Sequence, residues 1–258
     1  MSSEPVLLEI ENEIATVTLN QPKRRNPLSR TVTDALDEIL QTIRKEDVGC
    51  VVIEGNGKAF SAGGDIDEML DNIESDRSVD EMVQEWELYA ETTSRTIADV
   101  YNFPLPTVAK IDGLAVGAGA NLALACDVKL ASGSGSIGFG FRNVGLSVDS
   151  GTSYFLPRIV GENVAKELVL TGEMVDAKRA EKIGLVNHVF TEDYDVQCRE
   201  LVETIATGPS VALRHAARLV GESSHKTLEE AISDEAIAQG IAFTSPAHEA
   251  AVRAFKEG

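Results

Sequence analysis

Asp149 is the carboxylate whose surroundings in the sequence best suit acid–base chemistry. Residues 111–157 contain three acidic residues, Asp112, Asp127 and Asp149, whereas 42 Asp and Glu in 258 residues would place roughly eight in a segment of that length. The segment is rich in Gly, Ala, Leu and Val. A segment that loses charge in so acidic a chain is expected to be buried, because an unpaired buried carboxylate is costly.

Two of these three aspartates have ordinary explanations. Asp112 stands before Gly113 and Asp127 at the end of an apolar run, and both positions are typical of turn or capping residues. Asp149 lies in GLSVDSGTSYFLPR, where neither explanation applies. A carboxyl group in apolar surroundings has a raised pKa, because its charged form is poorly solvated, and a raised pKa suits proton transfer. We therefore predict that Asp149 is a catalytic residue.

Other motifs that could do chemistry lack the context they need. GSGSIG at 133–138 has the GxGxxG spacing of a dinucleotide-binding turn, but the following FGFRNVGLS does not have the pattern of a helix. The sequence contains no P-loop lysine motif and no GxSxG elbow for a serine nucleophile. Histidines and cysteines are scattered without metal-ligand or CxxC spacing, so we expect no metal site and no disulfide framework. They are His188, His215, His225, His248, Cys50, Cys126 and Cys198.

The composition disfavours several kinds of partner. There are 42 acidic and 23 basic residues, for a formal net charge of −19, and such a surface repels nucleic acid. No stretch approaches the roughly 20 apolar residues of a membrane helix, and MSSEPVLLEI does not resemble a secretory signal, so we expect a cytoplasmic protein. The acidity serves either plain solubility or, as we favour, adaptation to a salt-rich (halophilic) cytoplasm, which a loss of stability at low ionic strength would reveal.

Strands and helices alternate in the first part of the chain and helices dominate the rest. The predicted strands are 6–10, 14–19, 48–54, 107–111 and 127–131. The predicted helices are 31–43, 79–100, 121–126, 162–170, 177–183, 194–206 and 211–220. This order predicts a layered α/β fold, which we divide into a core over 1–195 and a helical C-terminal region over 196–258.

Two segments resemble the crotonase (enoyl-CoA hydratase/isomerase) superfamily. They are KAFSAGGDIDEM at 58–69 and IDGLAVGAGANLALACDVKLA at 111–131. In that family each segment supplies one backbone N–H, and the pair binds the thioester oxygen of an acyl-CoA. By position, the resemblance assigns these donors to Ala62 and Ala118. The second donor opens a helix, and a helix N-terminus carries unpaired N–H groups that suit a negatively charged oxygen.

The resemblance extends over most of the chain and implies the rest of the molecule. The implied fold is an α/β crotonase-type spiral of ββα turns with a helical C-terminal region that trimerises, giving a homotrimer or a dimer of trimers. The substrate is an acyl-CoA, with no cofactor beyond its CoA moiety. Residues expected at the CoA, the last two on a C-terminal helix near a CoA of the same or a neighbouring subunit, are Lys23, Arg24, Gly63, Gly64, Asp65, Ile66, Phe255 and Lys256.

The departures from the family pattern shape the functional prediction. Family hydratases use two glutamates, and these positions are Asn121 and Phe141 here, neither of which can transfer a proton at neutral pH. VGLSVDSGTSYFLPRIVG at 144–161 instead resembles the subgroup with a single aspartate, which includes ring-epoxide isomerases of phenylacetyl-CoA breakdown and some enoyl-CoA isomerases.

Double-bond migration needs one group that removes a proton at Cα and returns it at Cγ while the oxyanion hole holds the enolate. We predict that Asp149 does both, and that Asn121, Phe139, Phe141 and Tyr154 line the substrate pocket. Three alternatives stay open. They are a hydratase (lyase) of fatty-acid or aromatic acid degradation, an enzyme with Asp149 as nucleophile like the aryl-CoA dehalogenases, and a non-catalytic acyl-CoA-binding protein. A Clp-type serine protease shares the fold but needs a Ser-His-Asp set that we cannot place. The sequence does not identify the acyl group.

Overall fold

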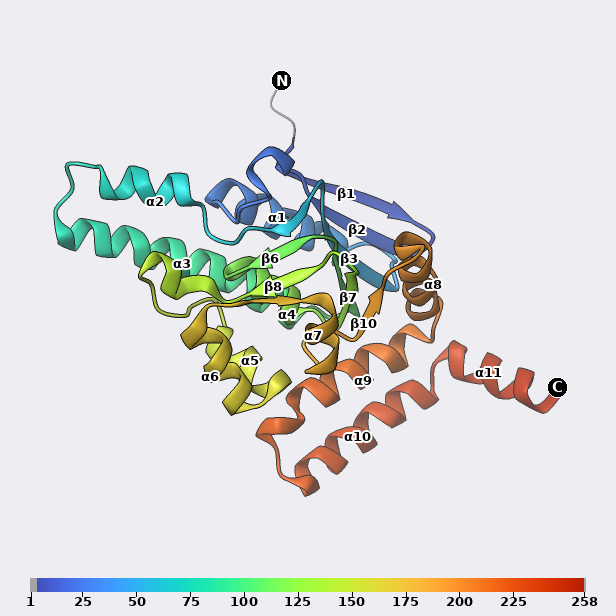
Figure 1. Ribbon diagram of the computed structural model, residues 1–258. Coiled ribbons are helices and arrows are strands. Elements are labelled where there is room, and N and C mark those ends of the chain that lie inside the picture. Colours follow the sequence, from blue (N-terminus) through green and yellow to red (C-terminus); the bar gives the residue numbers. More distant parts are fainter. Residues whose placement is uncertain (1–3, 258) are drawn as a thin grey trace.

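The computed structural model describes residues 4–257 and consists of two sheets surrounded by helices (Figure 1). The larger sheet has the order β1-β2-β3-β5-β7-β10 and the smaller one the order β4-β6-β8-β9. The strands of the larger sheet are β1 (Val6–Glu11), β2 (Ile14–Leu19), β3 (Cys50–Gly55), β5 (Thr107–Ile111), β7 (Val128–Ser132) and β10 (His188–Phe190). Those of the smaller sheet are β4 (Ala59–Ser61), β6 (Leu114–Val116), β8 (Ser136–Gly138) and β9 (Met174–Asp176).

The chain passes through both sheets in every repeat. β3, β5 and β7 pair in parallel in the larger sheet, and each is followed within a few residues by a three-residue strand of the smaller sheet, β4, β6 or β8, which also pair in parallel. A helical segment follows each pair: α2 (Ile66–Ile73), α4 (Ala118–Ala125) and the 3₁₀ segment η2 (Gly140–Val144). This is a spiral of two strands and a helix per turn, and the predicted α/β class is confirmed.

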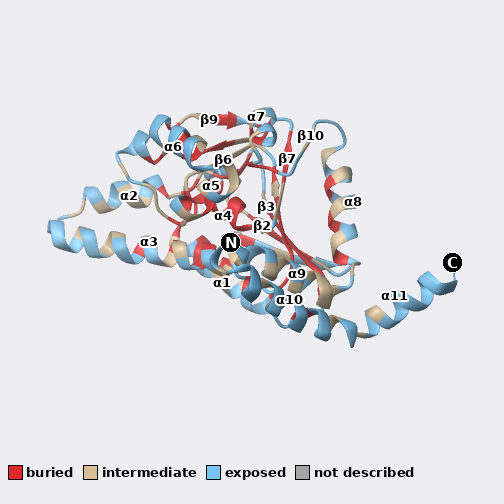
Figure 2. Ribbon diagram, turned by 90° about the horizontal axis from the view of Figure 1, so that it is seen from below, coloured by how far each residue is buried: buried red, intermediate tan, exposed pale blue. Residues whose placement is uncertain are grey.

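The remaining helices cover the sheets and extend beyond them. They are α1 (Arg30–Ile43), α3 (Val79–Tyr101), α5 (Thr152–Val160), α6 (Glu162–Thr171), α7 (Ala177–Lys182), α8 (Tyr194–Ala206), α9 (Ser210–Glu222), α10 (Leu228–Phe243) and α11 (Pro246–Glu257), with short 3₁₀ segments at η1 (Pro22–Arg24) and η3 (Ser223–His225). In Figures 1 and 2, α2 and α3 reach out at one end of the molecule, while α11 projects from the other end. The division of the chain near residue 195 stays a prediction.

Helix α4 lies at the centre of the core (Figure 2). All eight of its residues are buried, because AGANLALA has apolar or small side chains on every face. Gly119 allows its first turn to approach β4, since an added Cβ would lie 2.6 Å from the Cβ of Ser61. The only polar side chain inside this helix is that of Asn121, which is 0 % exposed and must therefore find hydrogen-bond partners within the protein.

Candidate active site

The site lies where the three strands β4, β6 and β8 end. Carboxyl ends of parallel strands meet at one edge of a sheet, so the turns after Ser61, Val116 and Gly138 converge. Small residues make this close approach possible. Gly63 has φ +84°, and a Cβ there would lie 2.3 Å from the carbonyl oxygen of Val116 and 3.3 Å from the amide nitrogen of Ala118. The two segments that resemble the crotonase family are therefore packed backbone against backbone.

A cavity of about 110 Å³ opens at these turns. Its lining is mostly apolar and comes from the turns, from α2 and α3, and from η2 and the loop after it. The lining residues are Gly64, Ile66, Met69, Trp86, Tyr89, Ala90, Thr93, Val116, Gly117, Ala118, Gly140, Phe141, Val144, Leu146, Asp149 and Ser150. Asp149 is the one acidic residue among them. The contribution of α3 has no signal in the sequence, because an apolar helix face that lines a cavity has the same pattern as one that packs in a core.

Asp149 has an unpaired carboxylate oxygen in this cavity. Its Oδ1 atom is buried and has no hydrogen-bond partner among the described residues. Burial raises the pKa of Asp149, and the neighbouring Ser150 hydroxyl opposes this shift by hydrogen bonding to the charged form. An acid whose pKa is raised by an apolar pocket and whose oxygen lacks a partner is suited to exchange a proton with a bound molecule.

Asn121 lies behind Asp149 and holds its loop in place. Its side-chain amide donates to the Asp149 backbone carbonyl over 3.1 Å and to the Thr152 hydroxyl over 2.8 Å, and the Thr152 hydroxyl also lies 3.0 Å from the same Asp149 carbonyl. Asn121 is not among the residues that line the cavity. The structure therefore places this predicted pocket residue as a support for the loop that carries the carboxylate.

Replacing Asn121 by Ala should lower the free energy of unfolding by about 1–3 kcal/mol, because it removes buried hydrogen bonds and leaves a void at the centre of α4. Turnover should fall more than acyl-CoA affinity, because the Asp149 loop loses its support. Asn102→Ala is the matched control, since that exposed amide bonds only the Ala98 carbonyl, and it should change stability by less than ~0.5 kcal/mol. Urea unfolding of both variants checks this, and equal stabilities would contradict it.

The two candidate oxyanion donors differ in availability. The Ala118 N–H is at the first position of α4, where the helix provides no acceptor, and it has no partner among residues 4–257. The Ala62 N–H instead donates to the Arg25 carbonyl over 2.8 Å. Its assignment as a donor is therefore wrong in this structure, because the hydrogen is already used. Gly64, two residues later, lines the cavity, and its N–H is without an acceptor in the described part of the chain.

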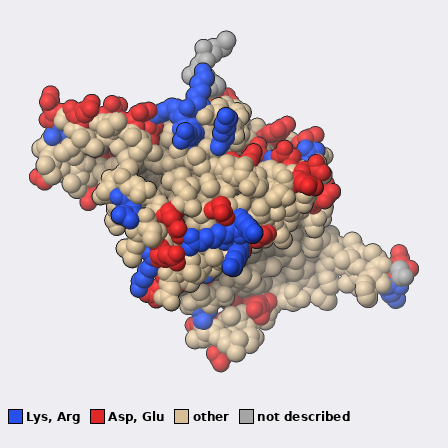
Figure 3. Space-filling model, in the orientation of Figure 1, with Lys and Arg blue, Asp and Glu red and all other residues tan. Residues whose placement is uncertain are grey.

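The basic loop and the turn before α2 are tied to each other. The Arg24 guanidinium lies 2.6 Å from one carboxylate oxygen of Asp65 and 2.7 Å from Asp67. Asp65 is 2 % exposed and caps α2 by accepting from the Asp67 and Glu68 N–H groups. Lys23 is exposed and makes no ion pair within residues 4–257. Basic atoms stand out below the N-terminal trace in Figure 3.

The other predicted site residues lie at different distances from the cavity. Ile66 and Phe141 line it, and Phe139 is fully buried outside its lining. Tyr154 is also outside. Its hydroxyl lies 2.9 Å from His225 Nε2, so it joins α5 to the α9–α10 connection. Phe255 is 92 % exposed and, like its neighbour Lys256, belongs to α11, which projects from the end of the molecule opposite to α2 and α3 (Figure 1).

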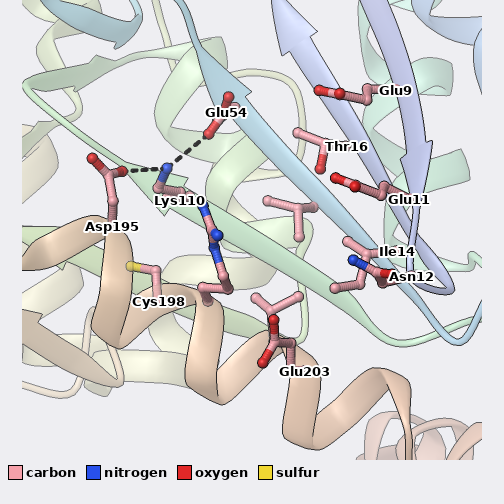
Figure 4. Close-up of a pocket in the computed structure, with 13 residues that line it drawn as sticks. Glu9, Glu11, Asn12, Ile14, Thr16, Glu54, Lys110, Asp195, Cys198 and Glu203 are labelled. Atoms are coloured by element: carbon pink, nitrogen blue, oxygen red, sulfur yellow. Dashed lines mark hydrogen bonds and ion pairs between the residues drawn. The ribbon is translucent and has the colours of Figure 1, made fainter.

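A larger depression, of about 380 Å³, lies between the β1–β2 hairpin and α8 (Figure 4). Its lysine, Lys110, lies 3.0 Å from Glu54 and 2.7 Å from Asp195, and this pair of contacts ties α8 to the sheet. None of the residues predicted for the site is among those lining it. Its charged groups are explained by α8 packing, so it is a poorer candidate for catalysis than the cavity of Asp149.

Fold and site together define a protein of the crotonase superfamily. The sequence profile of the enoyl-CoA hydratase/isomerase family matches residues 9–258. The chain is 30 % identical to the trans-2-decenoyl-(acyl-carrier-protein) isomerase of Streptococcus mutans over 100 % of this chain and 97 % of that protein. It is 28 % identical to the 1,2-epoxyphenylacetyl-CoA isomerase of Escherichia coli, covering 98 % and 95 % of the two chains. A solved enoyl-CoA hydratase from Bacillus anthracis superposes with a TM-score of 0.90 at 26 % identity, covering 98 % and 96 %. The chain belongs to the enoyl-CoA hydratase/isomerase family.

Proposed function

We propose that this protein is an acyl-CoA isomerase that moves a double bond, or rearranges a ring epoxide, through an enolate. The observation that carries the proposal is the single carboxylate of the cavity, Asp149, with its raised pKa and unpaired Oδ1. Hydration by the two-glutamate route needs a second proton-transfer group, and Asn121 is occupied in holding the loop while Phe141 is apolar. Moving one proton from Cα to Cγ needs one carboxylate.

In the proposed mechanism the thioester oxygen accepts hydrogen bonds from the N–H groups of Gly64 and Ala118. Asp149, as carboxylate, takes the proton from Cα; the negative charge develops on the thioester oxygen and is stabilised by the two amides and by the N-terminus of α4. The protonated Asp149 then delivers the same proton to Cγ, which completes the shift of the double bond. Because the lining is apolar, little water competes for the enolate.

The acyl group would extend toward the tips of α2 and α3. A second chamber of about 210 Å³ is lined by Met69, Asn72, Ile73, Met82, Trp86, Val144 and Leu146. Four of these residues also line the cavity of Asp149, so the two spaces are adjacent and share a wall. Methionine and tryptophan side chains suit an apolar chain or ring of variable shape. The decenoyl and phenylacetyl groups in the names of two relatives are groups of this kind.

The proposal extends to the CoA moiety and to assembly. Lys23 is the better candidate for a phosphate contact, because the Arg24 charge is compensated by two aspartates. Helices α9, α10 and α11 expose large apolar side chains, which favours the proposed homotrimer or dimer of trimers. These side chains are Val220, Leu228, Ile232, Ile237, Ile241, Phe243, Val252 and Phe255. Assembly of this kind would bring Phe255 and Lys256 to another subunit. A cytoplasmic location and a halophilic origin of the acidic surface stay part of the proposal.

A panel of acyl-CoA thioesters tests the function. 3-Enoyl-CoA substrates of 6 to 12 carbons and an epoxide-bearing aryl-acetyl-CoA should be isomerised faster than 2-enoyl-CoA substrates are hydrated. The gain in absorbance of the conjugated thioester follows 3-enoyl isomerisation, chromatographic separation of the product follows epoxide rearrangement, and the added mass of one water follows hydration. The hydratase alternative predicts the reverse order, and a non-catalytic binding protein predicts affinity without turnover. Faster hydration than isomerisation across the panel would overturn the isomerase assignment.

A further inference from the structure

A second polar atom in the cavity of Asp149 has no partner. Thr93, on α3, is 3 % exposed, and its hydroxyl oxygen is buried without a hydrogen bond to any described residue. Thr93 lines the same cavity as Asp149. An unsatisfied buried hydroxyl costs about 1–3 kcal/mol of stability, so a structural role alone does not account for it.

The other two threonines of α3 make a hydrogen bond to the helix backbone that Thr93 does not make. The Thr92 hydroxyl donates to the Leu88 carbonyl over 2.9 Å, and the Thr96 hydroxyl donates to the Thr92 carbonyl over 3.2 Å. This bond to the carbonyl four residues earlier is the usual way in which a threonine inside a helix satisfies its hydroxyl. Thr93 does not make it, and Thr93 is the one of the three that faces the cavity.

The phenol of Tyr89 does not satisfy the Thr93 hydroxyl. Tyr89 donates its single hydrogen to the Leu28 carbonyl over 2.8 Å and accepts from the Asp65 N–H at 3.3 Å. Burial raises the pKa of Tyr89 to about 12 and the nearby Thr93 side chain opposes this shift, but the Thr93 hydroxyl oxygen has no hydrogen-bond partner among the described residues. Because the phenol hydrogen is committed, the oxygen lone pairs of Thr93 stay without a donor.

We propose that Thr93 is a binding residue for an oxygen atom of the bound ligand, held in the same cavity as the Asp149 carboxylate. This inference rests on the proposed function and adds to it a hydrogen-bonding site, within the cavity, for an oxygen other than that of the thioester. The oxygen comes from one of two sources, a hydroxyl or epoxide on the acyl group or a water molecule seated beside it. Either source would complete the hydrogen bonding of Thr93.

The test compares Thr93→Val with Thr96→Val, which removes a partnered hydroxyl from the same helix at 1 % exposure. Thr93→Val should unfold at the wild-type temperature or above it, because it removes an unsatisfied group, whereas Thr96→Val should unfold at a lower temperature. Calorimetry then measures the affinity for a 3-hydroxyacyl-CoA and for the saturated acyl-CoA of equal length. Wild type and Thr96→Val should prefer the hydroxylated ligand by roughly 3- to 10-fold, the worth of one net hydrogen bond, and Thr93→Val should lose the preference.

The water source gives a different result. In that case wild type shows no preference between the two ligands, and Thr93→Val loses roughly 3- to 10-fold of its hydration rate on a 2-enoyl-CoA while Thr96→Val keeps it. If Thr93→Val alters neither the ligand preference nor hydration, or if it unfolds at a lower temperature than Thr96→Val, the inference is overturned. The preference for the hydroxylated ligand is measured by affinity and does not depend on turnover. A loss of that preference in Thr93→Val can therefore be told apart from a failure of the isomerase proposal, which Asp149→Asn tests.

Discussion

Replacing Asp149 by Asn is expected to reduce double-bond migration by about 10³-fold, within the range that proton transfer by a positioned side chain contributes. Asparagine keeps the shape of the side chain, and the backbone carbonyl of Asp149 keeps its bonds to Asn121 and Thr152. The affinity for a saturated acyl-CoA should stay within about 3-fold of wild type, since the group removed acts on the proton and not on the thioester. Initial rates with a 3-enoyl-CoA and calorimetric titration measure the two effects.

Asp112→Asn is the matched control for this variant. Asp112 belongs to the same charge-poor segment, but it is exposed and does not line the cavity, and among the described residues its carboxylate accepts only the Ser134 hydroxyl. Its activity should equal that of wild type. If Asp149→Asn turned over like Asp112→Asn, Asp149 could not be the proton-transfer group and the proposed function would fail.

Wild type and Asp149→Asn should also differ in how their free energies of unfolding depend on pH. Burial raises the pKa of Asp149 in the folded state above its ordinary value, which is near 4 in an unfolded chain. A raised folded-state pKa contributes stability below the unfolded pKa, and this contribution is lost as the pH rises through the folded pKa. Asp149→Asn should therefore be more stable than wild type at pH 7, and the difference should vanish by about pH 4. Urea unfolding at the two pH values measures it; a difference independent of pH would argue against a folded-state pKa of Asp149 that is raised by its apolar surroundings.

Replacing Ala118 by Pro is expected to lower turnover by about 10²- to 10³-fold, the usual loss when one oxyanion donor is removed. Ala118 is the first residue of α4, where proline is tolerated because the missing N–H has no helical acceptor. The preceding Gly117 has φ 55° and ψ −123°, outside the helical region that a following proline disfavours. The variant should therefore fold while losing a hydrogen bond to the enolate.

Ala118→Gly is its control, because glycine keeps the N–H and should keep turnover within a few-fold of wild type. Circular dichroism and thermal unfolding establish that both variants are folded. A folded Ala118→Pro protein with nearly normal turnover would show that the amide is not used. In that event the N-terminus of α4 would be a structural turn, and the thioester oxygen would have to be bound elsewhere.

The sequence motif did not identify which backbone N–H in the turn before α2 is available to the thioester oxygen. The segment FSAGGDID predicts a tight turn that presents an N–H, but its residues alone do not say which N–H is free. In the folded chain, the Ala62 amide is taken by the Arg25 carbonyl, from a loop almost forty residues earlier. Gly64 becomes available because no described group reaches it. A hydrogen bond between distant segments decided this, and such a bond has no local sequence signal.

The smaller sheet also has no clear signal in the sequence. β4, β6 and β8 have three residues each, too short to show an alternating pattern, and they form because parallel neighbours complete their hydrogen bonds. α2 was not predicted either, although Asp65 before it is a typical helix N-cap residue. Tyr154 was predicted at the substrate pocket, and its contact with His225, 71 residues away, holds it elsewhere.

The sequence by itself determined the α/β class, most of the longer strands and helices, and Asp149 as the carboxylate in an apolar setting. These features can be predicted from local sequence, because burial directly determines the spacing of apolar residues and the absence of charged ones. The tertiary structure alone decided which backbone N–H groups lack an acceptor among the described residues, that Asn121 supports the Asp149 loop, and that Thr93 lines the same cavity as Asp149. These depend on contacts between segments that lie far apart along the chain, so only the folded backbone brings them together.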